Sequence, residues 1–296
     1  MELRQLEYLV AVAEEASFTR AAQRVHISQS GVSAQVRQLE QELGADLLDR
    51  SGRVVTLTQA GEAALAHARA ALGATAALRQ AVDDVTGLLR GRLTVGMVTA
   101  CTITALFDAL DAFHRARPGV ALTLVEDSSA GLAERARSGA LDLALIGAAG
   151  APPEGLAVLP IVTEPLVAAV PAGHPLADRA RLTLAELSAL PLICMPPGTG
   201  IRAAFDQSCA ARGVQPVISL EASAAATVVD LTARGLGVAI LSESMAAAYP
   251  DRVRALPIKD AATPALLALA WKPAPSPALA ELIRHCRRAF DVTRDK

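Results

Sequence analysis

Hydrophobic and polar positions recur at helical spacing in two short segments near the N-terminus, within residues 17–43. In the second segment, apolar side chains at every third or fourth position form one stripe, which we expect to be buried. The stripe consists of Val32, Val36, Leu39 and Leu43. Ser17 or Thr19 can cap the first helix and Ser28 the second, because a side-chain oxygen there accepts from unpaired amides of the opening turn. The pattern therefore predicts two helices joined by the short segment 25–27.

The opposite face of the second helix is polar and carries Gln29, Ser30, Ser33 and Arg37. Glutamine can form two hydrogen bonds with adenine, arginine can do the same with guanine, and serine can bond bases or phosphates. Two helices with a tight joint are typical of a helix-turn-helix, whose second helix enters the DNA major groove. For this face taken alone, the solvated side of an ordinary surface helix is the alternative.

Residues 47–58 predict a β-hairpin wing, because two short β-prone runs flank the turn residues Ser51 and Gly52. Arg50 and Arg53 lie beside this turn. An arginine at the tip of a wing can enter the minor groove or neutralise a phosphate, which adds affinity with little base information. A surface hairpin with two solvated arginines is the alternative.

Net charge does not by itself indicate a nucleic-acid binder, since six arginines and eight acidic residues give positions 1–60 a net charge of −2. Binding must instead depend on where the arginines project, because affinity comes from phosphates neutralised at the contact surface. We expect the acidic side chains to point away from DNA. Those considered are Glu14, Glu15, Glu40 and Glu42.

A long run of this region closely resembles the DNA-binding domain of LysR-type transcriptional regulators; it reads AAQRVHISQSGVSAQVRQLEQELGADLLDRSGRVVTLTQAG. The resemblance extends over residues 3–61. The family often has Pro, Ala and Arg where this chain has Ser30, Gly31 and Ala34, and often Phe in place of Leu48. The missing arginine at position 34 removes one common base or phosphate contact, which leaves Gln29, Ser33 and Arg37 as the stronger candidates.

The resemblance implies a multidomain α/β protein with three parts: an α-rich winged helix-turn-helix domain, a long linker helix and a two-lobed α/β effector-binding domain. The expected bounds are 1–58, with the helix-turn-helix at about 18–37, then 59–90 and 91–296. It also implies a regulator whose promoter binding or activation responds to a small-molecule effector. The implied partners are double-stranded promoter DNA, RNA polymerase and further copies of the chain, in a homotetramer built as a dimer of dimers.

Residues 58–89 predict one long helix, because they are free of proline and place Glu62 near the positive end of the helix dipole. Its apolar stripe suits pairing with another chain, although it is looser than a strict heptad. The stripe comprises Leu65, Ala68, Leu72, Ala76, Val82, Val85 and Leu89. We favour a dimerisation helix; a helix packed on its own domain is the alternative.

After Gly91, strand-like and helix-like segments alternate in two successive series, which predicts two α/β lobes. A final strand and helix can return to the first lobe. Lobe one then spans 91–162 and 267–296, lobe two spans 163–266, and crossovers near 161–164 and 265–269 form a hinge. This arrangement resembles the type 2 periplasmic-binding-protein fold of LysR-type effector domains.

Two loops are candidates for the effector site, because ligands of α/β sheets collect beyond the carboxyl ends of strands. Segments 98–102 and 196–201 offer hydroxyls, amides and helix N-termini, a combination that favours a carboxylate or another anion. The candidate effector residues are Thr99, Cys101, Thr102, Ser128, Thr199, Gly200, Ile201, Arg202, Ser223 and Ala224. The alternative is that the threonines only cap helices and that Arg202 is solvated.

A thiol-based redox-sensing regulator is the alternative function, since Cys101 and Cys194 can both approach this cleft. Peroxide-sensing relatives place two reactive cysteines in the second lobe, however, and in this chain only Cys209 lies near that region, without the matching partner. The four cysteines and five histidines are scattered, without a CxxC or Cys/His ligand spacing. We therefore expect neither a disulfide framework nor a metal site.

Other functional classes find little support in the sequence. The chain lacks a P-loop, a GxSxG motif and a dinucleotide fingerprint, so we expect no catalytic residues and no cofactor. No apolar run approaches the roughly 20 residues that cross a bilayer. The N-terminal segment interrupts its apolar pattern with charges, so we expect no signal peptide, no membrane contact and a cytoplasmic location. An exported solute-binding protein, which would share the two-lobed domain, is accordingly disfavoured.

Overall fold

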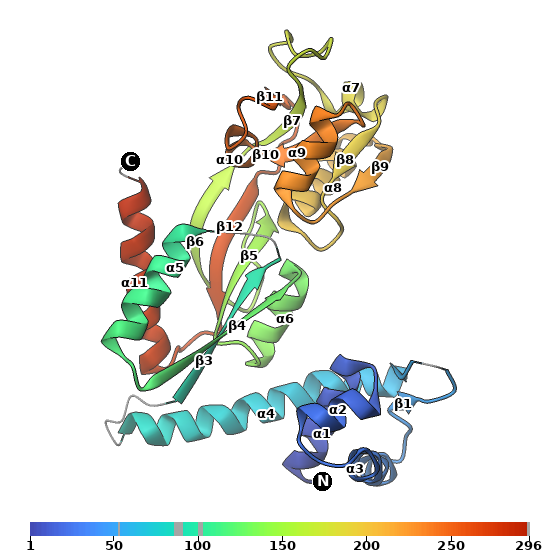
Figure 1. Cartoon of the computed structure of the whole chain (residues 1–296), viewed down its shortest axis with the longest axis vertical. Helices are drawn as coiled ribbons and strands as arrows, with labels where there is room; N and C mark the ends of the chain where they lie inside the picture. Colours follow the sequence, from blue (N-terminus) through green and yellow to red (C-terminus); the bar gives the residue numbers. More distant parts are fainter. Residues whose placement is uncertain (53, 86–90, 100–102, 295–296) are drawn as a thin grey trace. The chain divides into compact units, whose positions relative to one another are not determined.

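The computed structural model describes residues 1–52, 54–85, 91–99 and 103–294 (Figure 1). The chain forms two compact units, of which one contains Met1–Leu88 and the other contains almost all of the chain from Leu89 onwards. The first unit is mostly helical and includes a two-stranded hairpin, and the second holds two five-stranded sheets. This confirms the expected fold class.

Three helices form the core of the N-terminal unit, namely α1 (Leu3–Glu15), α2 (Phe18–Arg24) and α3 (Gln29–Leu43). The Ser17 hydroxyl accepts from the Arg20 amide at 3.4 Å, and that of Ser28 accepts from the Gly31 amide at 3.1 Å. These contacts confirm both predicted caps and select Ser17 over Thr19. In the joint between α2 and α3, His26 has a left-handed φ of 56°, which turns the chain sharply.

The buried stripe of α3 is confirmed at Val32, Val36 and Leu39, each fully excluded from solvent. It is wrong at Leu43, which is 48% exposed, while Glu40 is buried. The helix ends directly after Leu43, at the left-handed Gly44, so its last residue projects beyond the apolar core. Glu40 is buried in place of Leu43, and its carboxylate accepts hydrogen bonds from the Leu47 and Leu48 amides and from Arg50.

The predicted wing is confirmed as an antiparallel hairpin of β1 (Leu48–Asp49) and β2 (Thr56–Leu57), with Leu48 opposite Leu57. The Val55 amide donates to the Ala16 carbonyl at 3.3 Å, which joins the wing to the connection between α1 and α2. Arg53 lies outside the described residues.

The long helix α4 (Gln59–Val85) follows the wing, with only Thr58 between β2 and its start. Its first turns pack on their own domain: Ala68 is buried in the core of the N-terminal unit, Leu72 is half-buried against that core, and Leu65 is also buried. This part of the stripe therefore packs on its own domain, which was the alternative to a dimerisation surface. Leu89 lies outside the described residues, and for the other positions expected to continue the stripe, Ala76, Val82 and Val85, only the helical backbone is described.

Lobe one is built on a sheet with strand order β4-β3-β5-β12-β6. The strands are β3 (Gly91–Val98), β4 (Val120–Asp127), β5 (Leu143–Ala149), β6 (Ala157–Glu164) and β12 (Ala265–Trp271). Helices α5 (Thr104–Ala116) and α11 (Pro277–Arg294) pack side by side on one face, and α6 (Ser129–Ser138) covers the other (Figure 1). The C-terminal helix thus returns to lobe one.

Lobe two has the strand order β11-β7-β10-β8-β9. Its strands are β7 (Leu166–Pro171), β8 (Leu192–Cys194), β9 (Ile218–Glu221), β10 (Val238–Ser242) and β11 (Val253–Pro257). Its helices are α7 (Leu184–Ser188), α8 (Gly200–Arg212), α9 (Ala225–Ala233) and α10 (Glu243–Ala247). Helices α8 and α9 contribute to separate apolar clusters on the two sides of this sheet.

Both connections between the lobes leave lobe one at the same place, because Glu164 at the end of β6 pairs with Ala265 at the start of β12. Both residues belong to the sheet of lobe one, so each change of lobe lies two residues away from the bound expected from the sequence. The Glu164 carboxylate accepts from the Ser244 amide at 2.8 Å and from the Ser244 hydroxyl at 2.7 Å, which ties this crossover to lobe two.

Glu14 joins three helices of the N-terminal unit, since it pairs with Arg24 of α2 at 2.7 Å and with Arg69 of α4 at 2.9 Å. Burial alone would raise the pKa of its carboxyl, but the hydrogen bonds with Arg24 and Arg69 outweigh burial and hold that pKa below its usual value. A depressed carboxyl pKa stabilises the fold above the unfolded-state pKa and loses that effect as the pH falls through the folded-state pKa.

We expect Glu14→Gln to lower the free energy of unfolding by about 1 kcal/mol at pH 7. The difference from the wild type should shrink once the pH falls below about 4.3, where the unfolded carboxyl begins to hold its proton. Thermal unfolding followed by circular dichroism between pH 7 and pH 3 measures this. Glu7→Gln, at an exposed position of the same helix, is the control. A deficit that stays constant over the whole range would contradict the assignment.

Candidate nucleic-acid interface and ligand pocket

The polar face of α3 reaches the surface largely as the sequence predicts. Gln29, Ser30 and Arg37 are exposed, and Ser33 is half-buried. The Ser30 hydroxyl lies 3.2 Å from that of the capping Ser28. The side chain of Arg37 has no ion pair or hydrogen bond within the part of the chain that the structure describes, so its guanidinium is available to an outside acceptor. A face of this kind offers donors and acceptors that match base edges in a major groove.

Two acidic residues of α1, Glu14 and Glu15, are paired with arginines of α2. Arg24 bonds Glu14 at 2.7 Å, and Arg20 lies 3.5 Å from Glu15. Glu42 pairs with the N-terminal ammonium group, so it too is partly neutralised. Pairing of this kind reduces the repulsion that bare carboxylates would exert on a polyanion.

Arg50 differs from the expected free wing arginine, because it has partners within its own domain. Its Nη2 bonds the buried Glu40 carboxylate at 2.6 Å, and its guanidinium lies 5.6 Å from the centroid of the Phe18 ring. Only 29% of its side chain is exposed. These contacts favour a structural role for Arg50 over direct contact with DNA.

A pocket of about 290 Å³ lies between the two lobes of the second unit. Lobe one contributes Ser129 and Arg137 of α6 and Gly147 of β5, and lobe two contributes residues 198–200 and Ala203 at the start of α8. The first turn of α8 thus faces the pocket with backbone amides that have no partner inside the helix. Such a helix start favours a negatively charged group.

Two glycines allow the lobes to approach each other beside this pocket. A Cβ atom at Gly200 would lie 2.3 Å from the carbonyl carbon of Gly147, a distance that real atoms do not tolerate. The Gly147 amide in turn donates to the hydroxyl of the buried Ser129 at 2.9 Å. Glycine at position 200 is therefore required by close packing of α8 on β5, and its φ angle is ordinary.

Some of the predicted effector residues gather at this pocket. Thr199 and Gly200 line it, and Ser128 lies beside it, since its Oγ would be 3.8 Å from a Cβ atom at Gly198. Both hydroxyls also cap helices: Thr199 accepts from the Arg202 amide at 3.4 Å, and Ser128 accepts from the Gly131 amide at 3.2 Å. Thr99 is exposed and does not line the pocket, while Cys101 and Thr102 lie outside the described residues.

The remaining predicted residues point elsewhere. Ile201 is buried in the apolar core of lobe two, because α8 turns that position inwards. Arg202 is held by Asp206 at 3.0 Å and by Glu221 at 2.6 Å, so its charge is already satisfied. Ser223 is exposed and Ala224 is the N-terminal cap position of α9, and neither lines the pocket. The assignment of these four residues to the effector site is therefore not supported by their positions.

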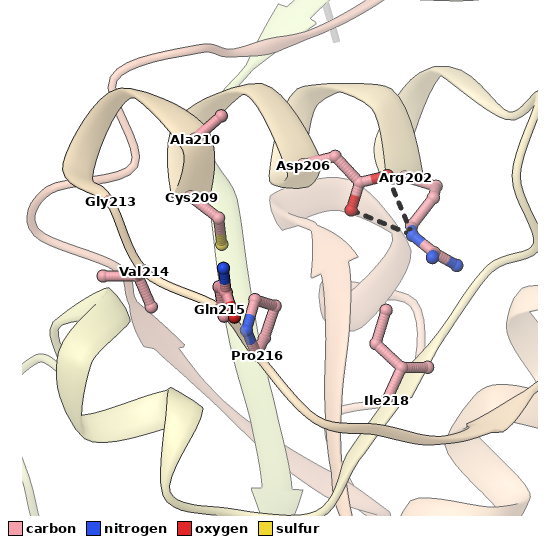
Figure 2. A pocket seen from close by; sticks show the side chains of 9 residues that line it. All are labelled: Arg202, Asp206, Cys209, Ala210, Gly213, Val214, Gln215, Pro216 and Ile218. Carbon is pink, nitrogen blue, oxygen red and sulfur yellow. Dashed lines mark hydrogen bonds and ion pairs between the residues drawn. The ribbon is translucent and has the colours of Figure 1, made fainter.

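Arg202 instead borders a second pocket, of about 540 Å³, on lobe two (Figure 2). Figure 2 shows Arg202, Asp206 and Cys209 along α8, with Val214, Pro216 and Ile218 on the segment that follows the helix.

Three residues that line the first pocket, Ser129, Arg137 and Gly147, were not predicted from the sequence. Ser129 directly follows the predicted Ser128 and could have been included, whereas Arg137 and Gly147 carry no local signal.

The described cysteines are poorly suited to thiol chemistry. Cys194, Cys209 and Cys286 are buried, and burial raises the pKa of their thiols to about 12, about 11 and about 12 respectively. The thiolate is the reactive form, so a raised pKa lowers reactivity at neutral pH. These three residues therefore give no support to the redox-sensing alternative.

The described residues hold neither a metal-binding cluster nor a helix that could span a membrane. No group of three or more His, Cys, Asp or Glu side chains is arranged there to hold a metal ion. Nor does any helix in this part of the chain combine the length and apolar character needed to cross a membrane.

A winged helix-turn-helix with a polar recognition face, combined with a two-lobed α/β domain, defines a DNA-binding transcriptional regulator with an effector-binding domain. The comparisons with known families agree. Residues 3–62 match the bacterial regulatory helix-turn-helix protein of the lysR family, and residues 86–291 match the LysR substrate binding domain. The chain belongs to the LysR family of transcriptional regulators.

Relatives and solved structures cover nearly the whole chain. It is 36% identical to the uncharacterized HTH-type transcriptional regulator YnfL of Escherichia coli (strain K12), over 92% of each chain. It is 35% identical to a probable hydrogen peroxide-inducible genes activator of Mycobacterium avium, over 84% of this chain and 80% of that protein. The structure of full-length CbnR complexed with its target DNA is similar with a TM-score of 0.59 and 26% identity, covering 98% of this chain and 100% of CbnR.

We expect Cys194, Cys209 and Cys286 to react with iodoacetamide at pH 8 at least about tenfold more slowly in the folded chain than in urea, because the folded thiols hold their protons. Mass spectrometry of the digested chain measures the label on each cysteine separately, so that Cys101 is scored on its own. Rapid labelling of any of the three in the folded chain would contradict their inert state.

We expect Gly200→Ala to destabilise the second unit by about 1–3 kcal/mol, because the added methyl group collides with the backbone of β5 and cannot be accommodated by a side-chain rotation. Thermal unfolding measures the change. Gly173→Ala is the matched control, since a Cβ atom there meets no atom within 4 Å. Equal stability of the two variants would show that α8 does not need this close approach.

Proposed function

We propose that a small molecule bound in the pocket between the lobes changes their arrangement and thereby alters promoter binding or activation. The observation that carries this proposal is that the pocket is made from both lobes, so that its shape depends on how they meet. A ligand shifts such an equilibrium only by the difference between its affinities for the two arrangements. The paired crossovers at Glu164 and Ala265 provide the place where the lobes can rotate.

The proposed ligand is a carboxylate or another small anion. The start of the 13-residue helix α8 faces the pocket, and a helix N-terminus carries a partial positive charge as well as unpaired amides. Arg137 also lines the pocket, but it pairs with Glu134 at 2.9 Å and donates to the Glu154 carbonyl at 3.1 Å, so part of its charge is already satisfied and the helix start is the main argument for an anion. A volume of about 290 Å³ is at the lower end of ordinary ligand pockets, which favours a compact metabolite.

On DNA, α3 would lie in the major groove with Gln29, Ser33 and Arg37 towards the base edges, and the wing would approach the adjacent backbone or minor groove. We propose that Arg53 neutralises phosphate there. Two such domains, paired through a dimer, would bind a partly palindromic operator, and two dimers would form the homotetramer. RNA polymerase would be contacted from the promoter-bound form.

The experiment that tests this function is a thermal-shift screen of the purified chain with small carboxylic acids and their uncharged amides. It is followed by fluorescence anisotropy with the intergenic DNA upstream of its own gene. The proposal expects at least one acid, but not its amide, to raise the unfolding temperature and change the affinity for this DNA relative to random duplex. Equal affinity for the two duplexes, with and without every acid tested, would reject it.

We expect Arg37→Ala to weaken binding to the specific duplex by about tenfold while leaving thermal stability unchanged, because the side chain is exposed and unpaired in the described structure. Arg4→Ala removes the same charge from an exposed position on α1 and is the control. Titration of both variants on specific and random duplexes measures the effect. If the two substitutions weaken binding equally on both duplexes, Arg37 contributes charge only and reads no base.

A further inference from the structure

Glu40 is a buried carboxylate with an unusual set of partners. It lies on α3 with 6% of its surface exposed, on the same helix that carries the polar recognition face. One oxygen accepts from the amides of Leu47 and Leu48 at 2.9 and 3.2 Å, where the chain enters the wing. The other accepts from Arg50 at 2.6 Å. A single side chain of α3 thus binds three groups of the wing.

Arg50 extends this connection to α2. Its guanidinium lies over the ring of Phe18, the first residue of α2, at 5.6 Å from the centroid, and its Nη1 lies 3.5 Å from the Leu48 carbonyl. Its Nε is buried and has no hydrogen-bond partner among the described residues. The guanidinium is therefore held where α2, α3 and β1 meet.

We expect the Glu40–Arg50 pair to fix the position of the wing more than to stabilise the fold. A buried ion pair gains little over apolar side chains of similar size, because desolvation offsets the attraction between the charges. The unpaired Nε adds a further desolvation penalty. What the contacts do provide is a fixed position, since one oxygen of the Glu40 carboxylate is bonded by two backbone amides of the wing and the other by Arg50.

We propose that Glu40 and Arg50 form a clamp that fixes the wing relative to α3, so that Arg50 is a positioning residue and does not bind DNA itself. The inference deepens the proposed function, because it rests on α3 and the wing contacting one duplex together. With the clamp closed, the position of β1 relative to α3 is set before DNA binds. DNA binding then does not have to order the wing.

Glu40→Gln provides a test in which two explanations predict opposite signs. The glutamine oxygen can still accept from Leu47 and Leu48, but its amide nitrogen faces Arg50 as a second donor, so the clamp opens. Removing a negative charge from a DNA-binding domain raises affinity by electrostatics alone. It also frees Arg50, which would raise affinity further if Arg50 were a DNA contact. The clamp alone predicts weaker binding.

The affinity experiment compares the full chain and four variants by anisotropy on the duplex that the wild type binds specifically. We expect Glu40→Gln and Arg50→Gln each to weaken binding by about tenfold, and the double variant to bind no more weakly than either one. Glu42→Gln, which removes an exposed carboxylate from the same helix, should bind as the wild type or slightly more tightly. Tighter or unchanged binding by Glu40→Gln would overturn the proposal, and so would single losses that multiply to about a hundredfold in the double variant.

A second readout separates the clamp from general destabilisation. At saturating concentrations of Glu40→Gln, guanine methylation protection under α3 should persist, whereas hydroxyl-radical protection under the wing should be lost. Joint loss of both footprints would overturn the proposal, because it would mean that the domain as a whole had become unstable.

Hydrogen exchange without DNA tests the clamp independently of the proposed function. The Val55 amide, which donates to Ala16 where the wing meets the helices, should exchange faster in Glu40→Gln than in Glu42→Gln, with exchange in α3 unchanged. Equal Val55 exchange in the two variants would overturn the clamp. Failure of the wild type to prefer its upstream DNA would instead count against the proposed function.

Discussion

Burial of one apolar stripe on α3 is the constraint on which the N-terminal unit depends. Val32, Val36 and Leu39 are fully excluded from solvent, so α3 cannot rotate about its axis without exposing them. This rotation angle decides the direction of every other side chain on the helix. It places Arg37 at the surface and turns Glu40 towards the wing, so the recognition face and the wing support are two results of one packing arrangement.

In the second unit, the corresponding constraint is the pairing of β6 with β12. Because Glu164 and Ala265 are neighbours in one sheet, the chain enters and leaves lobe two at a single place. The lobes also approach each other where Gly147 contacts Gly200, beside the pocket. A covalent connection at one place and a packed contact at another are the elements that a hinged ligand pocket needs.

The sequence predicted most of the elements and the part of the site that depends on local chemistry. Helical periodicity located α3, serine caps located its start, and the hairpin pattern located the wing. The failures concern contacts that only the fold creates. Leu43 fits the stripe by spacing but lies at the helix end, and Arg50 resembles a free wing arginine until Glu40 is seen beside it. Ile201 and Arg202 follow Thr199 in sequence, yet α8 turns one into the core and the other towards Glu221.

The short connection between the wing and α4 has a mechanical consequence. Only Thr58 separates β2 from α4, and its hydroxyl both donates to the Asp46 carbonyl and accepts from the Gly61 amide. A Cβ atom at Gly61 would overlap the Leu47 carbonyl, so α4 starts in direct contact with the base of the hairpin. The connection is too short to allow α4 to rotate independently of the hairpin. A rotation of the first turn of α4 would therefore move the base of the hairpin with it.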